Sequence, residues 1–359
     1  MHVSGAAMGD GWWVVGDQPT TDHQPPTTNH QPLTTYHLPP TTHHRSPFSM
    51  RIVSLLPSAT EIICALGLED QLVGVTHECD YPPAVARLPK VTKTLIPTNA
   101  SSREIDALVR DRLGAQSALY TLDMDALETL QPDLIVTQAL CDVCAVAEEE
   151  VKSAACKLSS LPNVLNLEPQ TLDEMLLSIR QVGVATRSEM RALAAIEALV
   201  GRIAAVVSRS QRVAHRPRVA LLEWLDPPFS TGHWNPELVQ LAGGVDGLGT
   251  AGEKSRMLRW EQVIAWQPEV VLISCCGFTA ERTMQEIGVL HSVTGWDDVP
   301  AVRDGRVYVT DGSSYFSRPG PRLVDSLELL GHVIHPSVHP LPEWVQAPVR
   351  LDQHAGAAR

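Results

Sequence analysis

MRIVSLLPSATEIICALGLEDQLVGVTHECDYP, residues 50–82, decides the fold of this chain. Within it, RIVSLL (51–56) is a short apolar run of the kind that forms a buried strand, and a proline ends the run. Ser58 and Glu61 then have the spacing of a capping box, which predicts the start of a helix. A second strand is expected at LVGVT (72–76). Strand, helix and strand in this order are typical of a parallel α/β sheet.

The same alternation continues on both sides of one long helical pattern. Further strands are expected at DLIVTQ (133–138), NVLNLE (163–168), RVALLEW (218–224), VVLISC (270–275) and RVYVTD (306–311), and a last helix at 322–335. The helical pattern opens with a capping box at Thr171 and meets no proline as far as Ser208, which predicts one helix of roughly 55 Å. Gly183 and residues 186–188 are the places where it could divide. The expected fold class is therefore α/β, with two Rossmann-like lobes linked by one long helix.

This pattern divides the chain into five parts. They are a repeat tail (1–49), a first α/β lobe (50–170), the linking helix (171–208), a second α/β lobe (209–335) and a polar, proline-containing tail (336–359). Four copies of a Thr-, His- and Pro-rich heptad fill residues 20–47 and offer little apolar surface to bury, so that segment is expected to be disordered. Its histidines could instead bind metal loosely. The second tail is expected to lie over the surface or to fray.

Composition limits the function classes. A net charge of −13 and the lack of a basic cluster argue against nucleic acid as a partner. No apolar run reaches the roughly 18 residues that a membrane span needs, and no signal-peptide core precedes Met50. Seven cysteines, an odd number, suit a reducing compartment. The sequence as it stands therefore predicts a soluble, cytoplasmic monomer, with a periplasmic protein as the alternative if the true start lies elsewhere.

Ligands of open α/β sheets bind beyond the carboxyl ends of the strands. Aromatic residues make up only 5% of the chain, yet several stand at such ends, as the walls of a site for a large planar ligand would. The candidate contacts read from these strand ends are Ser58, His77, Cys79, Asp142, Trp224, His233 and Trp234. Ser58 could equally be a helix cap only, and the two tryptophans could belong to the core.

A second group of candidates contains thiols. Cys141 and Cys144 form a C-x-x-C pair, and His77 with Cys79 could complete a tetrahedral metal site if the two loops meet. A redox-active pair and unreactive thiols lining the cleft are the alternatives. Sequence signatures of acyl transfer, nucleotide hydrolysis and dinucleotide binding are absent, which argues against an enzyme. The remaining enzyme hypothesis is a cytoplasmic metal-dependent or redox enzyme that uses Cys79, Cys141 and Cys144.

An internal repeat relates the two lobes. DALETLQPDLIV (125–136) aligns without gaps on EQVIAWQPEVVL (261–272). Each copy has an acidic residue, a short helical segment, Gln-Pro-acid and a buried strand. Asp125 and Glu261 thus occupy equivalent places, where a carboxylate is favoured by the dipole of the helix that it opens.

The opening stretch, together with DPPF (226–229), GHWNPELVQLAGG (232–244) and SRPGPRLVDSLELL (317–330), resembles the cobalamin-binding proteins of ABC importers, and the likeness extends from Met50 to about His335. The resemblance implies that cobalamin or a related corrinoid is held, as ligand and not as cofactor, between the two lobes. It implies delivery of the ligand to an ABC importer, whose permease pairs with Asp125 and Glu261, or to an intracellular salvage step. Glu78 and Thr94 stand where the family has aromatic residues. Iron-siderophore and haem binders share this architecture and are the alternative. The positions that match the lining of the cobalamin cleft are Asp80, Tyr81, Gln138, Phe229, Tyr315 and Arg318.

Overall fold

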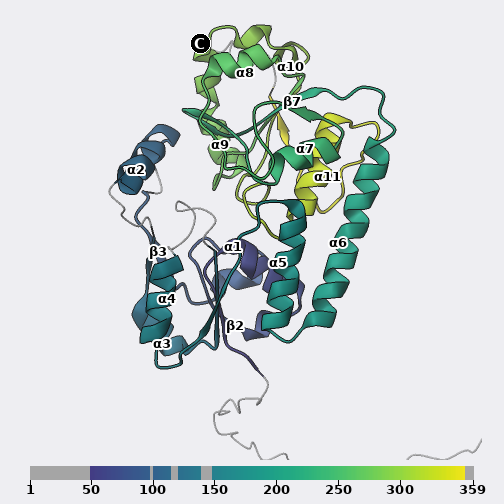
Figure 1. Ribbon diagram of the computed structural model, residues 1–359. Helices are drawn as coiled ribbons and strands as arrows, with labels where there is room; N and C mark the ends of the chain where they lie inside the picture. The colour runs from purple at the N-terminus through teal and green to yellow at the C-terminus, as the bar shows by residue number, and fades with distance from the viewer. Residues whose placement is uncertain (1–48, 98–99, 115–119, 139–147, 352–359) are drawn as a thin grey trace, which may run out of the picture. The chain divides into compact units, whose positions relative to one another are not determined.

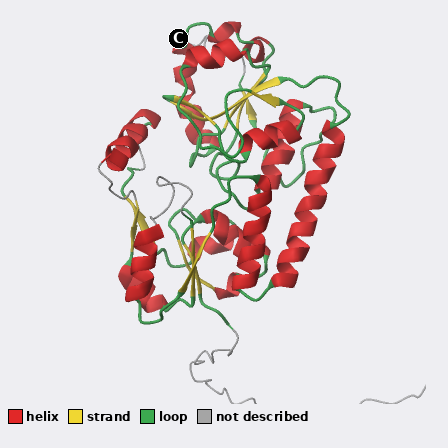
Figure 2. Cartoon of the chain, viewed as in Figure 1, coloured by secondary structure: helices red, strands yellow, loops and turns green. Residues whose placement is uncertain are grey.

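A computed structural model describes residues 49–97, 100–114, 120–138 and 148–351. All of them belong to one compact unit, Pro47–Arg359. This unit has one larger sheet in each lobe, with helices around it, and a small two-stranded sheet (Figures 1 and 2). The predicted fold class of two α/β lobes is confirmed. The predicted repeat tail, apart from its last residue, lies outside the described residues.

The first lobe is built on a four-stranded parallel sheet in the order β2-β1-β5-β6. Its strands are β1 (Ile52–Ser54), β2 (Leu72–Val75), β5 (Leu134–Thr137) and β6 (Asn163–Asn166). The other elements of this lobe are α1 (Pro57–Ala65), η1 (Glu69–Gln71), η2 (Pro83–Arg87), β3 (Thr92–Thr94), α2 (Ser102–Gly114), β4 (Tyr120–Leu122), α3 (Met124–Leu130) and α4 (Glu148–Lys157). β3 and β4 pair with each other as the small antiparallel sheet. Since β2 and β5 lie on opposite sides of β1, the carboxyl ends of β1 and β5 mark a topological switch point, where ligands of such sheets bind.

The second lobe repeats this strand order. Its parallel strands run β9-β7-β10-β11, with β8 and β12 added antiparallel to β7 and β11. The strands are β7 (Arg218–Leu225), β8 (Pro228–Ser230), β9 (Val245–Asp246), β10 (Val270–Ile273), β11 (Val307–Val309) and β12 (Val349–Arg350). The helices are α7 (Asn235–Leu241), α8 (Trp260–Trp266), α9 (Ala280–Glu286), η3 (Ile287–Ser292), η4 (Trp296–Asp298), α10 (Pro300–Arg303) and α11 (Leu323–Ile334).

The internal repeat has the same backbone geometry in both lobes. α3 and α8 each end on a left-handed glutamine, with φ of 46° at Gln131 and 50° at Gln267. Two positions after each glutamine, an acidic residue accepts a hydrogen bond from the backbone N–H of an arginine. In the first lobe this arginine precedes β1, and in the second lobe it begins β7. The two bonds are Arg51 N to Asp133 Oδ2, 2.8 Å, and Arg218 N to Glu269 Oε2, 3.0 Å. The Gln-Pro-acid signature therefore records the same connection to a central strand twice.

The segment between the lobes corrects the prediction of one uninterrupted helix. Two helices, α5 (Leu172–Ala185) and α6 (Glu189–Ser210), pack side by side in opposite directions (Figure 1). The hydroxyl of Thr186 donates to the Val182 carbonyl (2.7 Å) and Arg187 takes a φ of 56°, so α5 ends and the chain reverses. A Cβ on Gly183 would lie 2.5 Å from Cβ of Ala192, so the helices approach closely because this residue is glycine.

The apolar core is continuous from one lobe to the other. One cluster of buried residues includes Ile52 of the first sheet, Met175 of α5 and Val219 of the second sheet. α6 is also tied to both lobes by its arginines. Arg191 donates to the Gly67 carbonyl (2.9 Å), while Arg202 pairs with carboxylates of α11. We therefore expect the lobes to unfold together.

Of the two expectations for the chain after residue 335, the described residues 336–351 meet the first, since they lie over the surface of the second lobe and are held there. β12 adds an antiparallel edge strand to β11. His339 is 1% exposed, and the backbone N–H of Gln346 donates to the Tyr315 hydroxyl (3.0 Å). This segment is held by scattered tertiary contacts, which leave no periodic pattern in a sequence rich in proline and polar residues.

Candidate ligand site between the lobes

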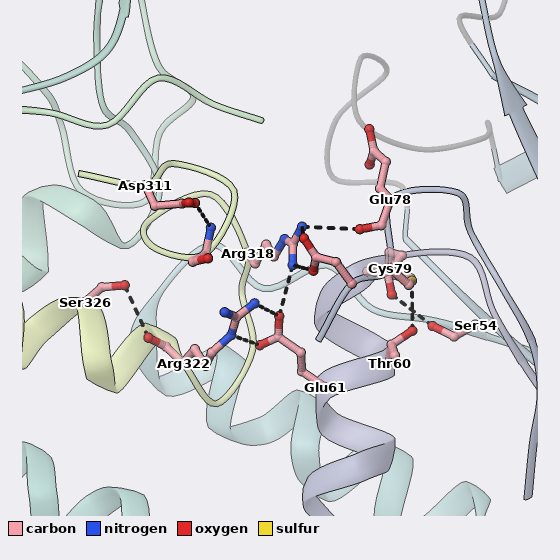
Figure 3. Close-up of polar contacts among 12 residues, drawn as sticks. Ser54, Thr60, Glu61, Glu78, Cys79, Asp311, Arg318, Arg322 and Ser326 are labelled. Carbon is pink, nitrogen blue, oxygen red and sulfur yellow. Dashed lines mark hydrogen bonds and ion pairs between the residues drawn. The ribbon is translucent and has the colours of Figure 1, made fainter. Parts of the chain in front are cut away.

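A buried carboxylate joins the two lobes. Glu61 lies on α1, and its side chain is 2% exposed. Arg322, at the start of α11, donates through Nε (3.1 Å) and Nη2 (2.6 Å) to its two oxygens (Figure 3). Burial raises the pKa of Glu61, and the hydrogen bonds and charges of Arg322 and Arg318 oppose that rise. The bidentate geometry makes this a strong contact between an arginine and a carboxylate.

The second arginine of the same loop binds the edge of the first lobe. Arg318 Nη1 lies 2.6 Å from Asp80 Oδ1 and 3.5 Å from Glu61 Oε1, and its Nη2 donates to the Glu78 carbonyl (3.3 Å). The guanidinium of Arg322 stacks over the ring of Tyr81 at 4.0 Å, and that ring is exposed. Three predicted contacts, Asp80, Tyr81 and Arg318, are thus gathered at the junction of the lobes. Asp80 and Arg318 bind each other there.

The prediction that Ser58 and Glu61 form a capping box is wrong. α1 begins at Pro57 with no side-chain cap, because Glu61 is turned toward the arginines and not back along the helix. Ser58 is 3% exposed and lies against the second lobe. A Cβ on Gly320 would be 3.3 Å from the Cα of Ser58, so the Arg-Pro-Gly-Pro-Arg turn approaches α1 at backbone distance.

The loop after β2 is held by polar contacts within the first lobe. His77 Nδ1 lies 2.8 Å from the Thr92 hydroxyl, and burial lowers the pKa of His77. Cys79 Sγ lies 3.1 Å from the Thr60 hydroxyl, and burial raises the pKa of Cys79 to about 11. At neutral pH His77 is therefore neutral, and Cys79 is a thiol of low reactivity.

The metal and redox hypotheses gain no support from this loop. Their other members, Cys141 and Cys144, and the predicted ligand contact Asp142 lie outside the described residues. Within the described residues, no three His, Cys, Asp or Glu side chains are grouped as a metal ion would require.

Gln138 stands at the carboxyl end of β5, at the switch point of the first sheet. It is 7% exposed, and its Oε1 has no hydrogen-bond partner among the residues that the structure describes. Buried amide oxygens normally have a partner, so this one remains able to accept a hydrogen bond from a ligand or an ordered water. The prediction that Gln138 faces a ligand agrees with this position.

Five further residues of the second lobe are predicted to contact the ligand, and the structure places three of them at partly exposed positions and two in the core. Trp224, Phe229 and His233 are partly exposed. Trp234 and Tyr315 are 3% and 6% exposed and belong to the continuous core, so their prediction as cleft walls is corrected. Trp234 Nε1 donates to the Phe316 carbonyl (2.8 Å), a bond that fixes the ring as a structural anchor.

The sequence did not predict the pair formed by Glu61 and Arg322 at the junction of the lobes. Glu61 was assigned to a helix cap, although a carboxylate within an otherwise apolar helix needs a cationic partner if it is buried. Arg322 stands within the SRPGPRLVDSLELL stretch and is not among the candidate contacts. The sequence signal that could have paired them is the presence of two arginines in one short Arg-Pro-Gly-Pro-Arg turn, because such a pair needs an acidic partner when it is buried. In the structure both arginines face Glu61.

Asp125 and Glu261 are exposed in the first turns of α3 and α8. Neither caps its helix. In α3 the side chain of Asp123 accepts a hydrogen bond from the backbone N–H of Ala126, and in α8 the side chain of Gln262 accepts one from the backbone N–H of Arg259 (2.9 Å).

Three comparisons place the chain among known proteins. The family model described as periplasmic binding protein matches residues 52–313. A vitamin B12-binding protein of Vibrio cholerae serotype O1 is 26% identical over 283 residues, which are 77% of this chain and 86% of that protein. An uncharacterised ABC transporter substrate-binding lipoprotein of Bacillus subtilis is 22% identical over 291 residues, which are 80% of each chain.

Solved structures show the same fold. A periplasmic haem-binding protein of Pseudomonas aeruginosa superposes with a TM-score of 0.63 at 22% identity, covering 84% of this chain and 99% of its own. The periplasmic vitamin B12-binding protein of Vibrio cholerae superposes with a TM-score of 0.57 at 22% identity, covering 80% and 98%.

Proposed function

The chain belongs to the periplasmic binding protein family, and we propose that it binds cobalamin or a related corrinoid between its two lobes without changing it chemically. A family of transporter substrate-binding proteins confirms the prediction of a binding protein and not an enzyme. The observation that carries the proposal is the gathering of Asp80, Tyr81 and Arg318, which match the lining of the cobalamin cleft, at the junction of the lobes. The similarity to the vitamin B12-binding protein of Vibrio cholerae supports the choice of ligand.

Direct binding tests this proposal. Purified protein incubated with cyanocobalamin and passed through a desalting column should retain the visible absorption of the corrinoid, with a Kd of about 1 μM or tighter, roughly −8 kcal/mol. A parallel incubation with haemin tests the second candidate, which the haem-binding structures of the same fold favour. Retention of haemin alone would replace cobalamin by haem, and retention of neither would refute both.

A matched pair of variants tests the position of the site. Tyr81→Ala removes an exposed ring stacked on Arg322 at the junction and should weaken cobalamin binding by about 1–3 kcal/mol. Trp344→Ala removes an exposed ring that stacks with Arg202 of α6, and should bind like the parent. Equal affinities in calorimetry for both variants and the parent would place the ligand elsewhere.

We also propose that Asp125 and Glu261 are the permease-docking residues, one in each lobe. Both are exposed, and neither is needed as a cap, since other side chains cap α3 and α8. Two separate acidic contacts would orient docking on a basic partner surface. Asp125→Arg combined with Glu261→Arg should abolish capture by an ABC permease in nanodiscs and leave cobalamin affinity unchanged. Glu281→Arg, an exposed first-turn acid of α9, is the control. Full capture of the double variant would remove the docking role.

The location of the protein is open to the same kind of test. None of the described helices has the length and apolarity of a membrane span. Relatives and structural neighbours are named as periplasmic proteins or as a lipoprotein, which favours the periplasmic alternative over the cytoplasmic prediction. Cell fractionation followed by immunoblotting should find the protein outside the cytoplasm. A purely cytoplasmic signal would restore the original prediction.

A further inference from the structure

A short segment of the first lobe reaches across to the second. Residues 100–106, here called the strap, lie between β3 and β4 in sequence and include the first turn of α2. Ile105 packs against the core of the second lobe, while Val109, one helical turn later, packs against the core of the first. α2 therefore contacts both lobes, and it stands beside α9 in Figure 1.

Three polar contacts hold the strap to the second lobe. The indole N–H of Trp224 donates to the Ser102 carbonyl (3.2 Å), and Arg282 donates to the Ala100 carbonyl (2.9 Å). Arg103 forms a bidentate pair with Asp226, with Nε to Oδ2 at 3.0 Å and Nη2 to Oδ1 at 3.2 Å. On the second lobe these contacts are made by Trp224 near the end of β7, by Asp226 directly after it and by Arg282 of α9.

The strap covers the part of the second lobe that a ligand would use. Trp224 is the penultimate residue of β7 and Phe278 follows β10, with ring centroids 5.0 Å apart, and Arg282 lies 4.7 Å above the Phe278 ring. β7 and β10 are neighbours in the sheet, and their carboxyl ends form its switch point. The strap backbone is thus bound to Trp224, one of the ligand contacts that the sequence predicts, near the carboxyl end of β7.

We infer that the strap is a gate. It binds the aromatic strand ends of the second lobe, and it must leave them before a large planar ligand can lie against Trp224. This inference rests on the proposed function, since it assigns the strap to the entry of that ligand.

Two of the bridges between the lobes, the Glu61–Arg322 pair and the strap, differ in burial, as a gate requires. Glu61 and Arg322 are 2% and 13% exposed at their side chains, and they join elements of the continuous core. Arg103 is 76% exposed, on a helix whose surface is largely polar. Exposed ion pairs contribute little, and segments with few buried apolar contacts open most readily. The strap is therefore the bridge that can open while the lobes stay joined.

A charge swap tests the gate. Arg103→Glu should break the pair with Asp226, speed amide hydrogen exchange of residues 102–111 at least about threefold, and raise the association rate of cyanocobalamin by a similar factor in stopped-flow fluorescence. Combining it with Asp226→Lys should restore both rates toward the parent. The control is Arg110→Glu, which makes the same charge change on α2 but removes a contact within the helix, with Asp106. It should leave the association rate near that of the parent.

The possible outcomes distinguish a failure of the gate from a failure of the proposed ligand. Unchanged exchange in Arg103→Glu would show that the pair does not hold the strap, and this arm needs no ligand. Faster exchange with slower association would overturn the gate and make the strap a wall that holds the ligand. If cyanocobalamin does not bind the parent, the proposed function fails, and the association arm is then run with haemin. A rate that rises in Arg103→Glu and returns in the charge-swap variant supports the gate.

Discussion

The pair formed by Glu61 and Arg322 allows a quantitative test. Glu61→Gln leaves a largely buried guanidinium without its carboxylate, while Arg322→Met leaves Glu61 with only the longer contact to Arg318, at 3.5 Å. Removing one member of a buried pair typically costs about 3–5 kcal/mol, because the remaining charge is desolvated without compensation. Arg318 keeps its contact with Asp80 at 2.6 Å, so we expect the lower end of this range, about 3 kcal/mol, for each single variant.

The assay is a double-mutant cycle from urea unfolding curves. Since both changes disturb one interaction, the double variant should lose about as much stability as either single variant, which gives a coupling energy of about 2–3 kcal/mol. The control cycle uses Glu149 and Lys152 of α4, an exposed pair at 3.7 Å, whose coupling should be close to zero. A coupling at Glu61 and Arg322 no larger than in the control would refute the reasoning, because the lobes would then be joined by apolar packing alone.

Two further predictions concern pH and packing. Burial lowers the pKa of His339 to about 4, below its unfolded value of about 6.5. Between these two pH values the unfolded state binds a proton that the folded state does not. The free energy of unfolding therefore falls by up to about 3 kcal/mol as the pH falls through that window. Unfolding curves at pH 7 and pH 4.5 should show a smaller loss for His339→Gln than for the parent, and equal losses would contradict this. Gly183→Ala should destabilise the α5–α6 hairpin by about 1–3 kcal/mol, because its Cβ would meet Ala192 at 2.5 Å. Gly201→Ala, in α6 with open space around it, should instead stabilise by about 0.5–1 kcal/mol, and a similar change in thermal unfolding for both would mean that the close approach of the helices costs nothing to relax.

The site was only partly predictable because its contacts join residues far apart in sequence. Asp80, Tyr81 and Arg318 were found by likeness to known sequences, and the structure gathers them. Trp234 has the same apolar character whether it lines a cleft or fills a core, and only the packing of α7 against α11 placed it inside. Residue type alone does not distinguish these two environments.

The sequence by itself determined the elements whose signals are local. Buried strands, the Gln-Pro-acid connections and the two α/β lobes follow from apolar runs, turn residues and a repeat, each readable within a dozen residues. Only the tertiary structure decided that the linking segment folds back at Arg187, that the chain after His335 joins the second sheet, and that Glu61 faces two arginines more than 250 residues away. These outcomes depend on which surfaces meet after the chain has folded. A buried charge takes its partner from whatever element packs against it, and no local pattern records that choice.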